Sequence, residues 1–132
     1  MMSRPSAAQI ERALRLLENE GHSGSSSEER SAAAAQVYDK LNAHLSPLLG
    51  PEGVRALFAR SVKLSKPEIA CLAELGGFDG AEKLRACLQA LDPQAATEAA
   101  AVLFGAFLDL ITMFIGDRLT VQLLRKAWPT IE

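Results

Sequence analysis

The longest apolar run of the chain lies at residues 99–115, and start and end signals for a helix flank it. Asp92-Pro93 is typical of an N-cap followed by proline at the first helical position, where the missing N–H costs no hydrogen bond. Gly116 favours a helix end, and Asp117 can cap a second helix toward the C-terminus. The pattern predicts a helical hairpin against which the rest of the chain packs.

Projected onto a helical wheel, residues 98–115 separate into two faces. Glu98 and Asp109 fall on a polar stripe that we expect to be solvated, together with the small residues Ala101 and Gly105, which permit close approach of another helix. The opposite sector is wider than a surface helix needs, so we expect two or more neighbouring helices or a second subunit against it. That sector holds Leu103, Phe104, Phe107, Leu108, Leu110, Ile111, Phe114 and Ile115.

Shorter segments with apolar residues three or four apart predict further helices. They lie at residues 6–21, 26–48, 51–64, 65–75 and 79–91, each opened by a capping residue or a proline. With the two helices of the hairpin they predict an all-α fold of six or seven helices. The segments differ in length and several breaks are abrupt, which favours an irregular, orthogonal bundle with a central apolar helix near residues 93–115 over a simple up-and-down bundle.

The sequence His-Ser-Gly-Ser-Ser-Ser at residues 22–27 is typical of a flexible linker. It divides the chain into an N-terminal helical arm, residues 1–21, and a helical domain, residues 28–132. A tether of this length permits the arm to dock on its own domain or to be exchanged with a partner subunit.

Composition narrows the class of protein. The 132 residues are 48% hydrophobic but only 5% aromatic, and alternating β-branched runs are absent, so we expect no sheet. The net charge of -2 gives no overall attraction to nucleic acid or to an anionic membrane. The apolar run is shorter than the roughly 20 residues of a membrane span, and Asp109 within it would cost about 2.5–3.5 kcal/mol on insertion. No membrane partner is expected.

The two cysteines, Cys71 and Cys87, each lie within an apolar helical pattern, which predicts reduced, buried thiols. The segment from Met1 to Pro5 has no apolar stretch of the kind found in a secretory signal. We therefore expect a cytoplasmic protein.

Sequence motifs of catalysis are missing. The chain has no phosphate-binding glycine loop, no G-x-S-x-G elbow, no H-E-x-x-H and no cysteine pair at metal spacing. His44 lies at the edge of an apolar face without a histidine or carboxylate one turn away, so a hydrogen-bonded structural role is favoured over a metal ligand. We expect no enzyme activity, no cofactor and no metal, although carboxylates from separate helices can converge without a sequence signal.

The leading hypothesis is a non-catalytic interaction or regulatory module that forms a homodimer. The wide apolar sector supplies the candidate interface, with the C-terminal tryptophan as a further anchor. These interface candidates are Leu103, Phe107, Leu110, Phe114 and Trp128.

One alternative is a small-ligand sensor with an apolar pocket between helices. Its lining would come from Phe104, Phe107, Leu110 and Met113.

A second alternative is an anion, an acidic partner or a nucleic acid bound by a basic face. That face carries Arg55, Arg60, Lys63 and Lys66 against a single Glu52. No aromatic side chains interleave with it to stack on bases, which makes nucleic acid an unlikely partner.

Two phrases resemble segments of small helical bacterial domains of uncharacterised function, some of which accompany signalling proteins. They are Leu48 to Leu57, read LLGPEGVRAL, and Ile115 to Thr120 continuing through Ala127-Trp128-Pro129. The resemblance covers about half of the chain and includes no catalytic residues. It implies a regulatory context and no activity.

Overall fold

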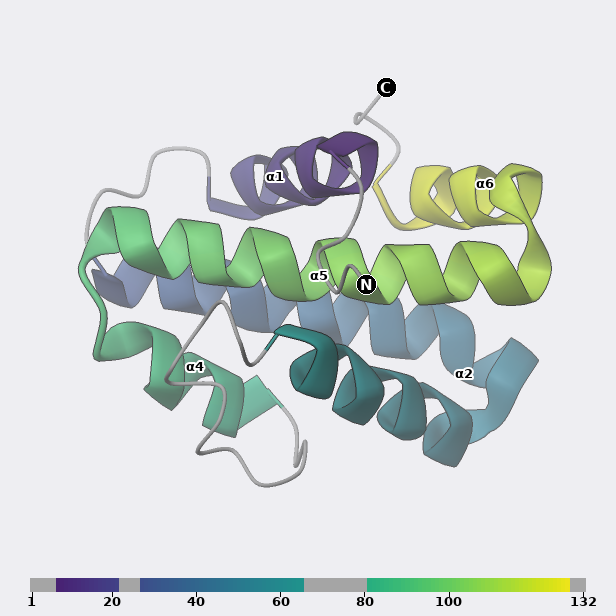
Figure 1. Cartoon of the computed structure of the whole chain (residues 1–132), viewed down its shortest axis with the longest axis horizontal. Helices are drawn as coiled ribbons and strands as arrows, with labels where there is room; N and C mark the ends of the chain where they lie inside the picture. The colour runs from purple at the N-terminus through teal and green to yellow at the C-terminus, as the bar shows by residue number, and fades with distance from the viewer. Residues whose placement is uncertain (1–6, 22–26, 66–80, 129–132) are drawn as a thin grey trace.

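The structure is a computed structural model that describes residues 7–21, 27–65 and 81–128, and over these residues it is all-α, as predicted. Its helices there are α1 (Ala7–Gly21), α2 (Ser27–Ser65), α4 (Ala81–Gln89), α5 (Pro93–Ile115) and α6 (Asp117–Ala127). α5 runs across the middle of the bundle, with α1 and α6 over one side and α2 and α4 on the others (Figure 1).

The prediction of six or seven helices is wrong for the described part of the chain, which holds five. Both segments expected on either side of Gly50-Pro51 are present, but they are joined in one element, α2, with a kink at Gly50, whose φ of 83° and ψ of 151° are not helical. Proline is tolerated in the first turn after a break, so helical hydrogen bonding resumes directly after the bend. The helix expected at residues 65–75 lies outside the described residues.

The caps predicted for the central helix are confirmed. Oδ1 of Asp92 accepts a hydrogen bond of 2.7 Å from the N–H of Ala95, and proline follows the cap. The helix ends at Gly116, whose φ of 92° favours glycine. Asp117 is not a cap as expected, because Gly116 occupies that position and Asp117 is the first residue of α6.

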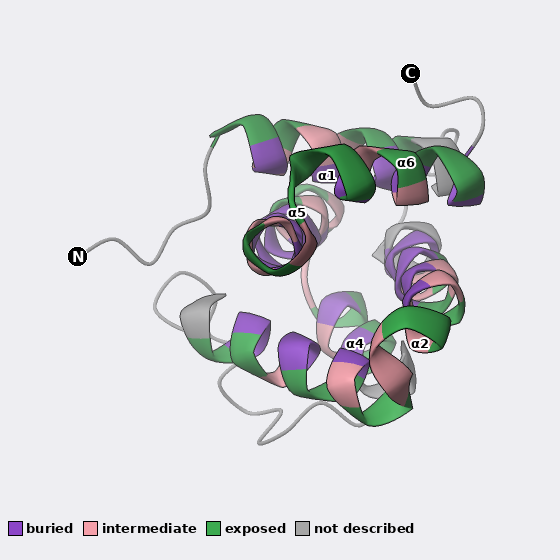
Figure 2. Ribbon diagram, turned by 90° about the vertical axis from the view of Figure 1, so that its right-hand side faces the viewer, coloured by how far each residue is buried: buried purple, intermediate pink, exposed green. Residues whose placement is uncertain are grey.

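Most of α5 is covered by its own chain, since it contacts α1, α2, α4 and α6. Figure 2 shows these neighbours around it. Of the two carboxylates expected to be solvated, Glu98 is exposed and Asp109 is half-buried. Ala101 and Gly105 are buried, in agreement with the close approach of another helix expected for these small residues. The apolar sector expected to need two or more neighbours therefore finds them within one chain.

The predicted arm forms α1, which lies on α5 and α2 of the same chain. Ala13, Leu16 and Leu17 bury their side chains in the shared core. The linker residues 22–26 lie outside the described residues.

The expectation of reduced thiols is wrong for Cys87, which is disulfide-bonded and half-buried on α4. The sequence holds one other cysteine, Cys71, outside the described residues. Helical periodicity describes only the local surroundings of a thiol and carries no information on which distant thiol it meets.

Candidate functional site

Three of the five predicted interface residues belong to the core. Leu103, Phe107 and Trp128 are at most 1% exposed, so their prediction as surface anchors is wrong. Helices of the same chain cover them, and the wheel projection could not distinguish such cover from a second subunit. Leu110 is half-buried and Phe114 is exposed.

The core around these residues is built on aromatic contacts. The ring of Phe58, from α2, stacks on Phe107 with centroids 4.0 Å apart and meets Phe104 edge-on at 6.0 Å. Tyr38 contacts the same ring at 4.5 Å. Offset and edge-on pairs of this kind add to the stability gained by burial alone.

This packing separates the residues predicted to line a ligand pocket. Phe104 and Phe107 are fully buried against Phe58, while Leu110 is half-buried and Met113 is exposed. The four side chains therefore do not face a common cavity.

Trp128 closes the bundle next to α2. Its backbone N–H donates to the carbonyl oxygen of Leu124 at 2.8 Å, which ends α6. Nζ of Lys40 lies 5.4 Å from the centroid of the indole ring, a cation–π contact. Both contacts are structural and leave the indole buried.

The exposed large apolar side chains of the described residues all lie within three residues of Gly50 or Gly116, at one end of the molecule. The kink of α2 and the turn between α5 and α6 both lie there (Figures 1 and 2). The exposed fractions are 61% for Leu48, 79% for Met113, 67% for Phe114 and 49% for Leu119. We call these four residues the apolar end surface. Leu110, Ile115 and Leu123 are half-buried members of the same helical segments.

Two glycines shape this end. Gly50 and Gly116 are the described residues with positive φ, at 83° and 92°. At each the helix cannot continue, so the chain bends or reverses and leaves the side chains of the last turn without a neighbouring helix. A sequence signal for this exposure was available. Leu48, Met113 and Phe114 each precede a glycine by two or three residues.

A chain of side-chain hydrogen bonds joins α1, α5 and α6 beside the α5–α6 turn. Nε2 of Gln9 donates to Oγ1 of Thr112 at 3.2 Å, which donates to Oγ1 of Thr120 at 3.5 Å, which donates to the carbonyl of Gly116 at 2.8 Å. Arg12 donates to Oε1 of Gln9 at 3.2 Å. Each threonine hydroxyl donates once, so the chain is mutually consistent and ties α1 to the α5–α6 turn.

An ion pair extends this connection to the surface. Nη1 of Arg12 lies 3.8 Å from Oδ1 of Asp117, the first residue of α6. A carboxylate there also interacts favourably with the positive end of the helix dipole. Because both side chains are partly exposed, the pair contributes little stability.

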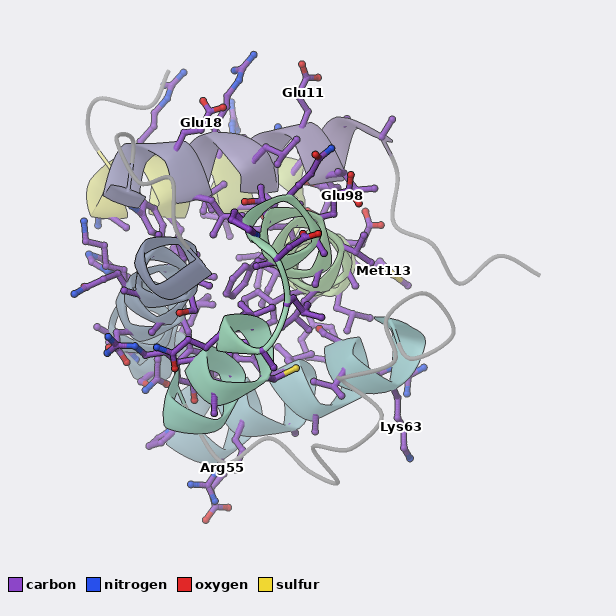
Figure 3. All side chains as sticks on the ribbon, turned by 90° about the vertical axis from the view of Figure 1, so that its left-hand side faces the viewer. Glu11, Glu18, Arg55, Lys63, Glu98 and Met113 are labelled. Atoms are coloured by element: carbon purple, nitrogen blue, oxygen red, sulfur yellow. The ribbon has the colours of Figure 1, made fainter. Side chains whose placement is uncertain are left out.

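The basic face of α2 is present as a solvated surface. Arg55, Arg60 and Lys63 are exposed, as is the acidic Glu52 beside them, and Lys66 lies outside the described residues. Arg55 and Lys63 point away from the bundle at separate places (Figure 3). The described basic residues do not converge on one anion site.

Groups that could perform chemistry are few. Among the residues that the structure describes, no group of three or more His, Cys, Asp or Glu side chains could hold a metal ion. Nδ1 of His44 lies 3.0 Å from the carbonyl oxygen of Lys40 and donates to it, which is the structural role expected. Burial raises the pKa of Tyr38, against the opposing effect of Arg55.

Of the helices in the described ranges, α5 alone is long and apolar enough to cross a membrane, and 61% of its most apolar stretch is buried within the chain. Core helices commonly have this property, so it carries little weight.

The chain matches no family model, no curated protein and no solved structure.

Proposed function

We propose that this chain is a non-catalytic, regulatory protein-interaction module that forms a homodimer through its apolar end surface. The observation that carries the proposal is the exposure of Leu48, Met113, Phe114 and Leu119 beside the kink of α2 and the α5–α6 turn, while much of the remaining apolar sector is internally covered. Contiguous exposed apolar patches on globular proteins commonly mark interaction sites.

The two segments that resemble small, uncharacterised helical bacterial domains lie in the same region. Leu48 begins one of them, and the other contains Gly116 and Leu119 at the turn into α6. Both therefore run through the apolar end surface, and the resemblance implies a regulatory context.

Sedimentation velocity of the full chain over a range of concentrations tests the proposal. We expect a monomer–dimer equilibrium with a midpoint in the micromolar range, and Phe114→Lys weakens it at least about tenfold by placing a charge in the desolvated centre of the contact. Ala86→Lys is the matched control, because it adds the same charge at an exposed position of α4. A chain that stays monomeric at high concentration, or equal association of all three proteins, would overturn the proposal.

A further inference from the structure

The start of α1, residues 7–12, buries a polar side chain rather than an apolar one. Its buried residue is Gln9, whose Nε2 donates to Oγ1 of Thr112 on α5 at 3.2 Å. Nη1 of Arg12 lies 3.8 Å from Oδ1 of Asp117 on α6. The buried apolar residues of α1 all lie later in the helix. Because polar groups can exchange such contacts for contacts with water, the start of α1 can separate from the bundle at lower cost than the rest of the helix.

The residue that Gln9 contacts belongs to the hydrogen bonds that shape the α5–α6 turn. The carbonyl oxygen of Thr112 accepts a bond of 2.8 Å from the N–H of Gly116. The carbonyl oxygen of Gly116 accepts from both the N–H and the hydroxyl of Thr120, at 3.1 Å and 2.8 Å. No atom lies within 4 Å of a Cβ built on Gly116, so hydrogen bonds rather than side-chain packing hold this residue.

The two threonines of this turn are direct neighbours of the apolar end surface. Thr112 precedes Met113 and Phe114, and Thr120 follows Leu119. Thr112 is half-buried and Thr120 is 1% exposed, whereas the three apolar side chains are exposed. The hydroxyl groups on the inner side and the apolar groups on the outer side therefore share the same short stretches of backbone. Fixing the first orients the second.

We infer that docking of the start of α1 regulates association through the apolar end surface. Gln9, acting through Thr112, holds the α5–α6 turn in the conformation that forms the dimer, and release of the start of α1 weakens the dimer. This inference rests on the proposed function and specifies its regulation. A surface that is ordered before contact loses less conformational freedom on binding, so the docked state associates more tightly. Linkage then requires that dimer formation favours the docked state of α1.

A buried charge at position 9 tests the regulation. Gln9→Lys places an ammonium group where the parent side chain is 7% exposed, so the start of α1 must leave the bundle to hydrate it. We expect the dissociation constant of the dimer, measured by sedimentation velocity of the full chain, to rise at least about tenfold. Ala8→Lys is the matched control, because it adds the same charge at the exposed neighbouring position and should leave the constant within about twofold of wild type.

A second control separates regulation from general loss of stability. Val62→Ala removes buried methyl groups from α2 and lowers the stability of the whole fold. At a temperature where every variant is folded, we expect it to leave the dissociation constant within about twofold of wild type. Weakening as large as that in Gln9→Lys would overturn the inference, since any destabilised chain would then associate poorly.

Amide hydrogen exchange tests the role of Gln9 without a contribution from association. In chains made monomeric by Phe114→Lys, Gln9→Met should speed exchange of the Gly116 N–H by about three- to tenfold, because one hydrogen bond to the turn is lost. In chains that already carry Thr112→Val, Gln9→Met should have no further effect, since its partner hydroxyl is absent. Unchanged exchange in Gln9→Met, or equal effects with and without Thr112→Val, would overturn the role of Gln9 in holding the turn.

The outcomes separate this inference from the proposal on which it rests. Wild-type dimers that respond to Phe114→Lys but not to Gln9→Lys overturn the regulation and leave the apolar contact in place. A wild-type chain that stays monomeric overturns both. If Gln9→Lys does not fold, Thr112→Val in the otherwise native chain provides the test: we expect association about three- to tenfold weaker than wild type, and an unchanged dissociation constant contradicts the inference.

Discussion

Phe107 and Phe114 lie two turns apart on α5 and point in nearly the same direction, yet they have opposite surroundings. Phe107 is fully buried, and its ring stacks on Phe58 at a centroid distance of 4.0 Å. Phe114 is 67% exposed one residue before the helix ends in Ile115. A helical wheel gives both residues the same direction, and only the presence of a neighbouring helix decides which becomes core and which becomes surface.

The comparison divides α5 into two parts with different roles. From Ala99 to Leu108 every residue is buried, because helices of the same chain cover all sides. The last turn extends to the α5–α6 corner, where Met113 and Phe114 are exposed. Stability depends on the first part, and we expect association to depend on the second.

Truncating the two phenylalanines gives the largest expected contrast. Phe107→Ala removes a stacked, fully buried ring and should lower the free energy of unfolding by about 3–5 kcal/mol. Phe114→Ala removes an exposed ring and should change it by less than about 0.5 kcal/mol. Urea unfolding at submicromolar concentration measures both without a contribution from association. Equal losses would mean that Phe114 is covered in the monomer, contrary to the division of α5.

Much of the fold could be predicted because its signals are local. Asp92-Pro93 and Gly116 mark the ends of α5 through cap geometry and positive φ, which depend on the residues themselves. The break at Gly50-Pro51 was also located, because Gly50 has a positive φ that favours glycine and proline fits the first turn of the helical segment that follows.

The candidate site was less predictable because it depends on tertiary contacts. Leu103 and Trp128 are large apolar residues of the kind that anchor interfaces, but helices of the same chain bury them. Leu48 and Leu119, which no wheel distinguishes from core leucines, are exposed because the chain turns away beside them. The disulfide of Cys87 could not be predicted for the same reason, since helical periodicity contains no information about distant contacts.

Gly116, at the α5–α6 turn, gives the second contrast when it is compared with Gly53 in α2. At Gly116 φ is 92° and ψ is 158°, a region essentially restricted to glycine, so Gly116→Ala should cost on the order of 1–3 kcal/mol. No atom lies within 4 Å of an added Cβ, so the expected cost comes from the backbone alone. Thermal unfolding measures it.

Gly53→Ala is the matched control. Gly53 lies within the helix, where alanine gains up to about 1 kcal/mol in propensity. Its added Cβ would lie 3.2 Å from Cβ of Leu49, and this crowding offsets part of the gain. A loss in Gly53→Ala as large as that in Gly116→Ala would contradict the assignment of the cost to backbone conformation.

The smallest effect at neutral pH is expected at Tyr38, the only tyrosine of the chain, which packs edge-on against Phe58. Burial raises its pKa above the ordinary value of 10.0, and nearby Asp39 acts in the same direction while Arg55 opposes it. The unfolded chain therefore releases the phenolic proton at lower pH than the folded chain. The contribution to stability is fully present below the unfolded pKa and is lost as pH rises through the folded pKa, with a slope of at most about 1.4 kcal/mol per pH unit.

Tyr38→Phe should remove this part of the alkaline loss of stability, as measured by urea unfolding at a series of pH values above 9. Phe114→Tyr is the counterpart at the exposed end of α5. Because Phe114 is 67% exposed, the phenol added there should be in contact with water. Phenolate absorbance should then rise in two steps, first for the new tyrosine near the ordinary pKa and later for Tyr38. A single step for both phenols would show that the aromatic cluster and the last turn of α5 have equal access to solvent, and the distinction between them would fail.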